Sequence, residues 1–215
     1  MRGTLFLVVL ALAASAGASV VTSIPGGTVI PMPAMDYFGG GPISFGPSNL
    51  VKWGSTNTKN QGGSVFGYTG GYGFGANGAW TGARGPMAGL NDSNDFYGVT
   101  DTMTFAFARP VQAVGGFLNY YPGSLNPTTI AVYDSGGNLI EAYDLTFTTS
   151  AADDTGAFYG FLESSPVISY FTLSDNYVGI TDLTVGGGVP EPGTFLLLGS
   201  GLLGAAGYGR RLLGF

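Results

Sequence analysis

The clearest pattern of apolar and polar positions in this chain lies in its second half, between residues 102 and 185. Met103, Phe105 and Phe107 alternate with smaller or polar residues, and a period of two is typical of a strand with one buried face. Short apolar runs then recur roughly every ten residues, with turn residues rather than amphipathic helices between them. The predicted strands are residues 102–108, 113–121, 128–133, 139–143, 145–149, 157–162, 167–173 and 177–185. This pattern predicts an all-β fold, a single β-sandwich of the jelly-roll kind.

The first half of the chain is dominated by glycine and aromatic residues and has poor periodicity. Residues 36–98 predict short strands joined by glycine-rich turns, whereas the prolines in residues 19–35 predict an irregular leader. In the second half, Arg109 and Pro110 are expected to end the first strand, and residues 134–138 (DSGGN) to form a hairpin turn. We therefore expect one domain over residues 19–185 and a glycine linker at 186–188.

The N-terminal residues have the layout of a secretory signal peptide. Arg2 supplies positive charge, residues 5–14 (LFLVVLALAA) are an apolar run, and Ala16-Gly17-Ala18 fits a small-x-small cleavage site. A helix that spans a membrane needs about 20 apolar residues, so this run is too short to be one. We expect residues 1–18 to form a signal helix that is removed after Ala18, and cleavage after Ala16 is the alternative.

The C-terminal residues 189–215 combine three features in a fixed order. Pro190-Glu191-Pro192 cannot continue a helix, because each proline fixes φ and lacks a backbone N–H. Residues 194–209 are apolar and uncharged, and as a helix they would rise about 24 Å against a hydrocarbon core of about 30 Å. Arg210 and Arg211 follow, and basic residues beside an apolar span are normally retained on the cytoplasmic side. The segment predicts a short helix that acts as a transient membrane stop.

This arrangement closely resembles the C-terminal sorting signal of bacterial PEP-CTERM proteins. The resemblance is carried by Pro190, Glu191 and Pro192, by the Gly/Leu-rich span, and by Arg210 with Arg211. It implies an exported protein that an exosortase-type membrane protease processes near the motif, with a destination in the cell envelope or the extracellular polymer matrix. Residues 107–111, 113–117, 132–134 and 180–183 are similar to the galactose-binding-like β-sandwich of many such proteins.

Composition excludes several classes of function. The chain has no histidine and no cysteine, which removes Ser-His-Asp and Cys-His catalysis and the usual zinc sites. Without disulfides, stability has to come from the core. Residues 19–189 carry four basic and twelve acidic side chains, a net charge of 4 − 12 = −8. An acidic body without a basic cluster argues against nucleic acid as a partner.

One loop offers ligands for calcium. Asn91, Asp92, Asn94 and Asp95 place several hard oxygen donors within five residues, and Ca²⁺ takes six to eight oxygens. Residues 153–154 or 175–176 are the acidic neighbours that would complete such a site. The alternative is a solvated turn, because Asn and Asp also stabilise turns by bonding their own backbone. A structural calcium ion is the one cofactor that the sequence offers.

Aromatic residues offer a second kind of site, since their faces can stack on sugar rings. Trp80, beside a glycine-rich loop, is the leading candidate, and the alternative is that it packs in the core. Gly73–Gly78 matches the dinucleotide pattern G-x-G-x-x-G only formally, because no helical period follows it.

A glycoside hydrolase needs two carboxylates roughly 5–10 Å apart, and the spacing pairs none of the acidic residues, Glu141 and Glu163 included. The favoured function is a non-catalytic, exported structural protein of the cell envelope or extracellular matrix. Its body would act as a structural module or as a module associated with extracellular polysaccharide. A secreted carbohydrate-binding module is the alternative, and a hydrolase comes after it. Self-association through the glycine/aromatic-rich residues 62–80 is a further option.

Overall fold

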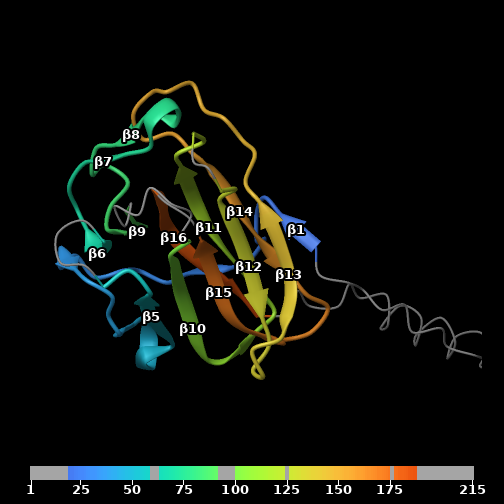
Figure 1. The fold of residues 1–215 in the computed structure, drawn as a ribbon. Helices are drawn as coiled ribbons and strands as arrows, with labels where there is room; N and C mark the ends of the chain where they lie inside the picture. Colours follow the sequence, from blue (N-terminus) through green and yellow to red (C-terminus); the bar gives the residue numbers. More distant parts are fainter. Residues whose placement is uncertain (1–18, 59–62, 92–99, 124–125, 175–176, 188–215) are drawn as a thin grey trace, which may run out of the picture.

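The structure is a computed structural model that describes residues 19–58, 63–91, 100–123, 126–174 and 177–187 (Figure 1). Two antiparallel sheets packed face to face form the body, which confirms the predicted all-β sandwich. The helices expected in residues 1–18 and 194–209 lie outside the described residues. In the part that the structure describes, no helix has the length and apolar character needed to cross a membrane.

The larger sheet has the strand order β1-β14-β11-β16-β9-β6-β3, and β2 pairs with β16. Its strands are β1 (Ser19–Val21), β2 (Thr28–Val29), β3 (Tyr37–Phe38), β6 (Ser64–Tyr68), β9 (Met87–Leu90), β11 (Ala113–Tyr120), β14 (Ala157–Leu162) and β16 (Val178–Gly186). The second sheet has the order β13-β12-β15-β10-β5-β4. Its strands are β4 (Ile43–Phe45), β5 (Val51–Ser55), β10 (Thr102–Val111), β12 (Thr129–Tyr133), β13 (Leu139–Asp144) and β15 (Ile168–Ser174). A separate pair, β7 (Tyr72–Gly73) with β8 (Ala79–Trp80), and the short 3₁₀ turns η1 (Pro47–Asn49) and η2 (Gly75–Asn77) complete the described elements.

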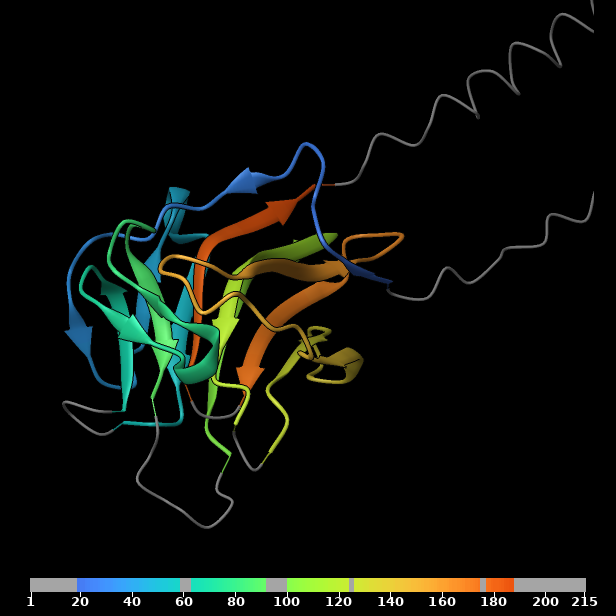
Figure 2. The same cartoon turned by 90° about the horizontal axis from the view of Figure 1, so that it is seen from above.

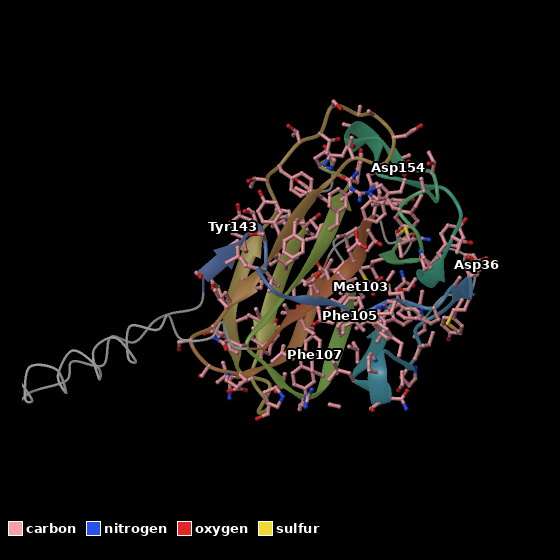
Figure 3. All side chains as sticks on the ribbon, turned by 180° about the vertical axis from the view of Figure 1, so that it is seen from behind. Asp36, Met103, Phe105, Phe107, Tyr143 and Asp154 are labelled. Atoms are coloured by element: carbon pink, nitrogen blue, oxygen red, sulfur yellow. The ribbon has the colours of Figure 1, made fainter. Side chains whose placement is uncertain are left out.

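The main core lies between the two sheets and follows from the alternation in the sequence. On β10, Met103, Phe105 and Phe107 are all buried, and Figure 3 shows them in a row along one strand. Phe171 of the neighbouring β15 has its ring centroid 6.3 Å from that of Phe105 and 6.4 Å from that of Phe161, which belongs to the opposite sheet. Aromatic side chains from both sheets therefore fill the space between them, as in other sandwiches.

A second, smaller cluster covers the outer face of the larger sheet. We call it the outer cluster; its buried members are Val65, Tyr72, Phe74, Trp80 and Met87. Two glycines, Gly89 of β9 and Gly179 of β16, are directly paired beneath it. A Cβ atom at Gly179 would lie 2.9 Å from Phe74 and from Trp80. The glycines thus provide the close approach that lets large rings lie against the sheet.

The strands predicted after residue 102 are confirmed, with one exception and one extension. Residues 145–149 form no strand, so that prediction was wrong. The reason is that their backbone is bonded elsewhere: the Leu145 N–H donates to the Thr128 carbonyl (2.8 Å), and the Thr149 N–H donates to Asn77 Oδ1 (3.2 Å). The first of these strands, β10, continues through Pro110 to Val111, with an irregular register after Ala106.

The two ends of the described chain leave the sandwich on the same side (Figure 2). Ser19 pairs with Leu162, Leu162 with Ala113, and Ala113 with Gly186, so these four residues form one row across the larger sheet. At a strand spacing of about 4.8 Å, Ser19 and Gly186 are roughly 14 Å apart. Residues 19–35, which were expected to form an irregular leader, contain the strands β1 and β2. Gly186, which was expected in the linker, is the last residue of β16.

Candidate functional site

Trp80 does not present a face to solvent, so its prediction as a glycan-stacking residue was wrong. The side chain is 1% exposed and belongs to the outer cluster. Its indole Nε1–H donates to the carbonyl oxygen of Thr155 at 2.7 Å, and its ring centroid lies 4.9 Å from that of Phe74. Trp53 is likewise fully buried. Neither tryptophan can stack on a sugar, because tertiary packing covers both.

The predicted calcium loop lies almost entirely outside the described residues. Of its four ligands, Asp92, Asn94 and Asp95 are outside, and Asn91 is the last described residue before them. The Asn91 N–H donates to the Gly63 carbonyl (2.7 Å), and its buried Oδ1 has no hydrogen-bond partner. Among the described residues there is no group of three or more acidic side chains that could hold a metal ion. Calcium binding therefore stays a prediction.

Asp154, one of the acidic neighbours expected to help such a site, has a structural role. Its carboxylate accepts hydrogen bonds from the Thr81 backbone N–H (2.8 Å) and from the Thr81 hydroxyl (2.7 Å). These bonds, with a smaller contribution from the charge of Arg84, lower the pKa of Asp154. The carboxylate thus fastens the loop at residues 151–156 to the end of β8.

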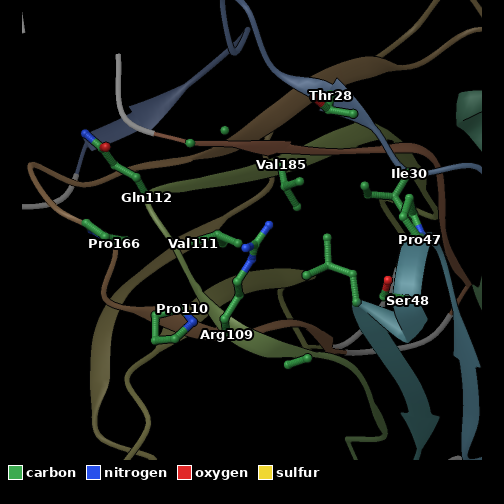
Figure 4. A pocket seen from close by; sticks show the side chains of 14 residues that line it. Thr28, Ile30, Pro47, Ser48, Arg109, Pro110, Val111, Gln112, Pro166 and Val185 are labelled. Carbon is green, nitrogen blue, oxygen red and sulfur yellow. The ribbon is translucent and has the colours of Figure 1, made fainter. Parts of the chain in front are cut away.

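A large hollow in the described body lies at the end of the sandwich where β16 finishes. It has a volume of about 760 Å³, and Figure 4 shows its lining side chains. Segments far apart in the sequence build it: the region around β2, the turn η1, the end of β10, Pro166 and the end of β16. The lining residues are Thr28, Ile30, Pro47, Ser48, Leu50, Ala108, Arg109, Pro110, Val111, Gln112, Pro166, Val185, Gly186 and Gly187.

Arg109 is the charged residue of this pocket. Its side chain extends from β10 into the hollow between Val111 and Ser48 (Figure 4), and none of the lining residues is acidic. Within the described ranges, the guanidinium has no hydrogen bond or ion pair to another residue. Sequence reasoning assigned Arg109 only to the end of a strand, because the pocket is assembled from distant segments that no local pattern connects.

Two glutamates that the spacing did not connect come together at one edge of the sandwich. Glu141 lies on the edge strand β13, and Glu163 directly follows β14. Burial raises the pKa of both side chains, and the negative charge of Glu141 raises that of Glu163 further. Each has one buried carboxylate oxygen without a hydrogen-bond partner. The signal that could have found this pair is the alternation along each strand, which places Glu141 with Tyr143 and Glu163 with Phe161 on the inner face.

A column of aromatic rings stands beside these glutamates. Tyr143 and Tyr159 are stacked with centroids 5.6 Å apart, and Tyr159 stacks in turn on Phe147 at 5.5 Å. Tyr120 meets Phe147 edge-on at 5.1 Å and donates its hydroxyl to the Phe147 carbonyl oxygen (2.9 Å). The stacked faces of these rings are covered by neighbouring rings. Phe147 thus holds residues 145–149 against β11 and β14.

Comparisons with known proteins identify the C-terminal segment. The model of the PEP-CTERM protein-sorting motif matches residues 188–211. A comparison with the curated proteins found no match. Among solved structures, a Clostridium perfringens ZmpB structure, containing CBM51-2 in complex with GlcNAc and INT domains, is 12% identical with a TM-score of 0.38. The match covers 63% of this chain and 30% of that one. A DUF4465 family protein from Bacteroides caccae is 12% identical with a TM-score of 0.39, and the match covers 84% of this chain and 99% of that one.

The sheets make the body an all-β sandwich, and a PEP-CTERM sorting motif follows it. The resemblance drawn from Pro190, Glu191 and Pro192 is confirmed by the match over residues 188–211. The motif marks an exported protein sorted to the cell surface and implies membrane association and processing by an exosortase. The matched segment begins two residues beyond the end of β16.

Proposed function

We propose that this protein is a non-catalytic structural component of the cell envelope or extracellular matrix, delivered as a folded sandwich and released at its sorting motif. The observation that carries the proposal is the placement of the motif. It begins two residues beyond β16, and the expected signal-peptide cleavage point after Ala18 adjoins β1, whose Ser19 lies in the same row of the larger sheet as Gly186. Both membrane-directed segments therefore adjoin the same row of the larger sheet, and among the described residues neither removal breaks a strand pair.

The placement of the carboxylates supports the absence of a catalytic role. Asp134 accepts hydrogen bonds from the backbone of Gly136 and from both the side chain and backbone of Asn138, within its own hairpin turn. Asp154 fastens a loop, as described above. Glu141 and Glu163 do not line the pocket of Figure 4. Asp134 and Asp154 thus have structural roles.

Substitution of the motif tests the sorting step. We expect that replacing Pro190, Glu191 and Pro192 by alanine leaves the protein as an unprocessed precursor in the membrane fraction of its producing cells. The matched control is Leu213→Ala, which changes an apolar residue just beyond the matched range. The control should be processed like the wild type. Wild-type processing of the triple variant would contradict the proposal.

A further inference from the structure

The pocket at the end of β10 contains an unusual cation for this molecule. The described body has few basic side chains, and Arg84 is already engaged: its guanidinium carbon lies 3.4 Å from the centroid of the Phe117 ring, and its Nε donates to the Asp154 carbonyl at 3.1 Å. Arg109 has no such partner among the described residues. An exposed guanidinium in an acid-free hollow of an acidic protein attracts an anionic group.

The walls of the pocket define the rest of the ligand. Pro47, Pro110 and Pro166 supply rigid apolar surfaces, while Thr28 and Ser48 supply hydroxyl groups. A volume of about 760 Å³ lies within the usual range of ligand pockets, roughly 300–1,000 Å³. Apolar faces, scattered hydroxyls and one unpaired cation fit a sugar that carries a carboxylate. The C–H face of its ring can pack on the prolines while its hydroxyls take hydrogen bonds.

We propose that this pocket binds a uronic acid unit of a glycan, with the guanidinium of Arg109 holding the sugar carboxylate through two parallel hydrogen bonds. This inference rests on the proposed function, in which the released sandwich is a component of the cell envelope or extracellular matrix. The net charge of −8 over residues 19–189 disfavours a continuous polyanion, because long acidic polymers are repelled by such a surface. The ligand is therefore a glycan in which uronic acid units are separated by neutral sugars.

The chain itself offers a competing carboxylate. Gly187 lines the pocket, and Glu191 follows four residues later, so an extended segment could reach about 13 Å from Gly187. A tethered carboxylate has an effective concentration in the millimolar range. The glycan is favoured because the hydroxyl-bearing wall matches a sugar, and because processing near Pro190 would cut the tether in the released protein.

The test is calorimetric titration of the purified full chain in detergent micelles. The probe is a disaccharide of glucuronic acid and a neutral sugar, and the control ligand is the same disaccharide with glucose in place of the acid. We expect the acidic probe to bind at least about tenfold more tightly than the neutral one, since an Arg–carboxylate pair combines charge with two hydrogen bonds. Arg109→Gln should remove this preference. Lys52→Gln, an exposed basic residue outside the pocket, should leave it unchanged.

Three results would overturn the assignment. The first is equal affinity for the acidic and neutral probes, and the second is unchanged binding by Arg109→Gln. The third is absence of binding by both wild type and Glu191→Gln at about 10 mM probe, which limits any affinity to the range weaker than millimolar. Binding that appears only in Glu191→Gln would support the site, because it would show that the chain's own carboxylate competes for the pocket while the tether is uncut. None of these results bears on export, which is measured in cells.

Discussion

Replacing Trp80 by alanine is expected to remove a large part of the stability of the sandwich. The indole fills the middle of the outer cluster, over the floor made by Gly89 and Gly179. Truncation to a methyl group leaves a cavity there, because the paired glycines carry no side chains that could move into it. A loss of stability is what burial of Trp80 predicts, whereas an exposed glycan-stacking residue could be truncated with little effect on stability.

The magnitude follows from burial and from one hydrogen bond. Truncating a buried Trp to Ala typically costs about 3–5 kcal/mol, and losing one neutral hydrogen bond costs about 1 kcal/mol. The Thr155 carbonyl keeps a second donor, Asn119 Nδ2 at 3.1 Å, so it is not left unpaired. We expect a loss of about 4 kcal/mol in the free energy of unfolding. For a domain of this size that lowers Tm by roughly 8–16 °C.

The assay is urea-induced unfolding of the full chain in detergent micelles, followed by tryptophan fluorescence, which Trp53 alone supplies in the Trp80 variants. Trp80→Phe keeps a ring in the cluster and should cost less than Trp80→Ala. Leu139→Ala, which truncates a side chain 57% exposed, serves as the control and should change stability by no more than about 0.5 kcal/mol. If Trp80→Ala matched Leu139→Ala, the assignment of Trp80 to the core would be refuted.

Two further predictions concern stability. Glu163→Gln should raise Tm at neutral pH by a few degrees and leave it unchanged well below pH 4.5, the ordinary pKa of the group. Burial and the charge of Glu141 raise the pKa of Glu163 in the folded protein. The contribution of Glu163 to folding stability is therefore fully present at low pH, where the side chain is protonated in both the folded and the unfolded protein, and it is lost as the pH rises through the folded-state pKa. A Tm gain for Glu163→Gln that did not depend on pH would contradict this. Gly160→Ala should destabilise the protein, measured by thermal unfolding, because a Cβ there would overlap the carbonyl oxygen of Val114, whereas Gly73→Ala, with open space around it, should be tolerated.

Local chemistry explains which parts of the fold could be predicted from the sequence. The alternation of apolar and polar residues is enough to predict the buried face of the strand that contains Met103 and Phe105. The hairpin at 134–138 is fixed by Asp134, whose carboxylate binds backbone N–H groups two and four residues later. These signals lie within a few residues of one another. The sorting motif is equally local, since its prolines and glutamate are consecutive.

The remaining features depend on contacts between distant segments. From the sequence alone, Trp80 looks like an exposed aromatic residue in a loop. Its burial depends on the pairing of Gly89 with Gly179, which lie far from each other in the sequence. Leu145 lies in an apolar run that predicts a strand, but its N–H finds the Thr128 carbonyl. Arg109 becomes a candidate binding residue only when η1 and the end of β16 approach it. Glu141 and Glu163 meet across the sandwich edge, which sequence spacing cannot reveal.

The central claim is that both ends of the chain direct export and that the sandwich is what remains. The most direct measurement is the intact mass of the protein recovered separately from the cytoplasm, the membranes and the medium of its producing cells. The account predicts a surface or extracellular species that has lost residues 1–18 and has been cut near Pro190. A cytoplasmic protein with the mass of all 215 residues, and no processed species elsewhere, would contradict it.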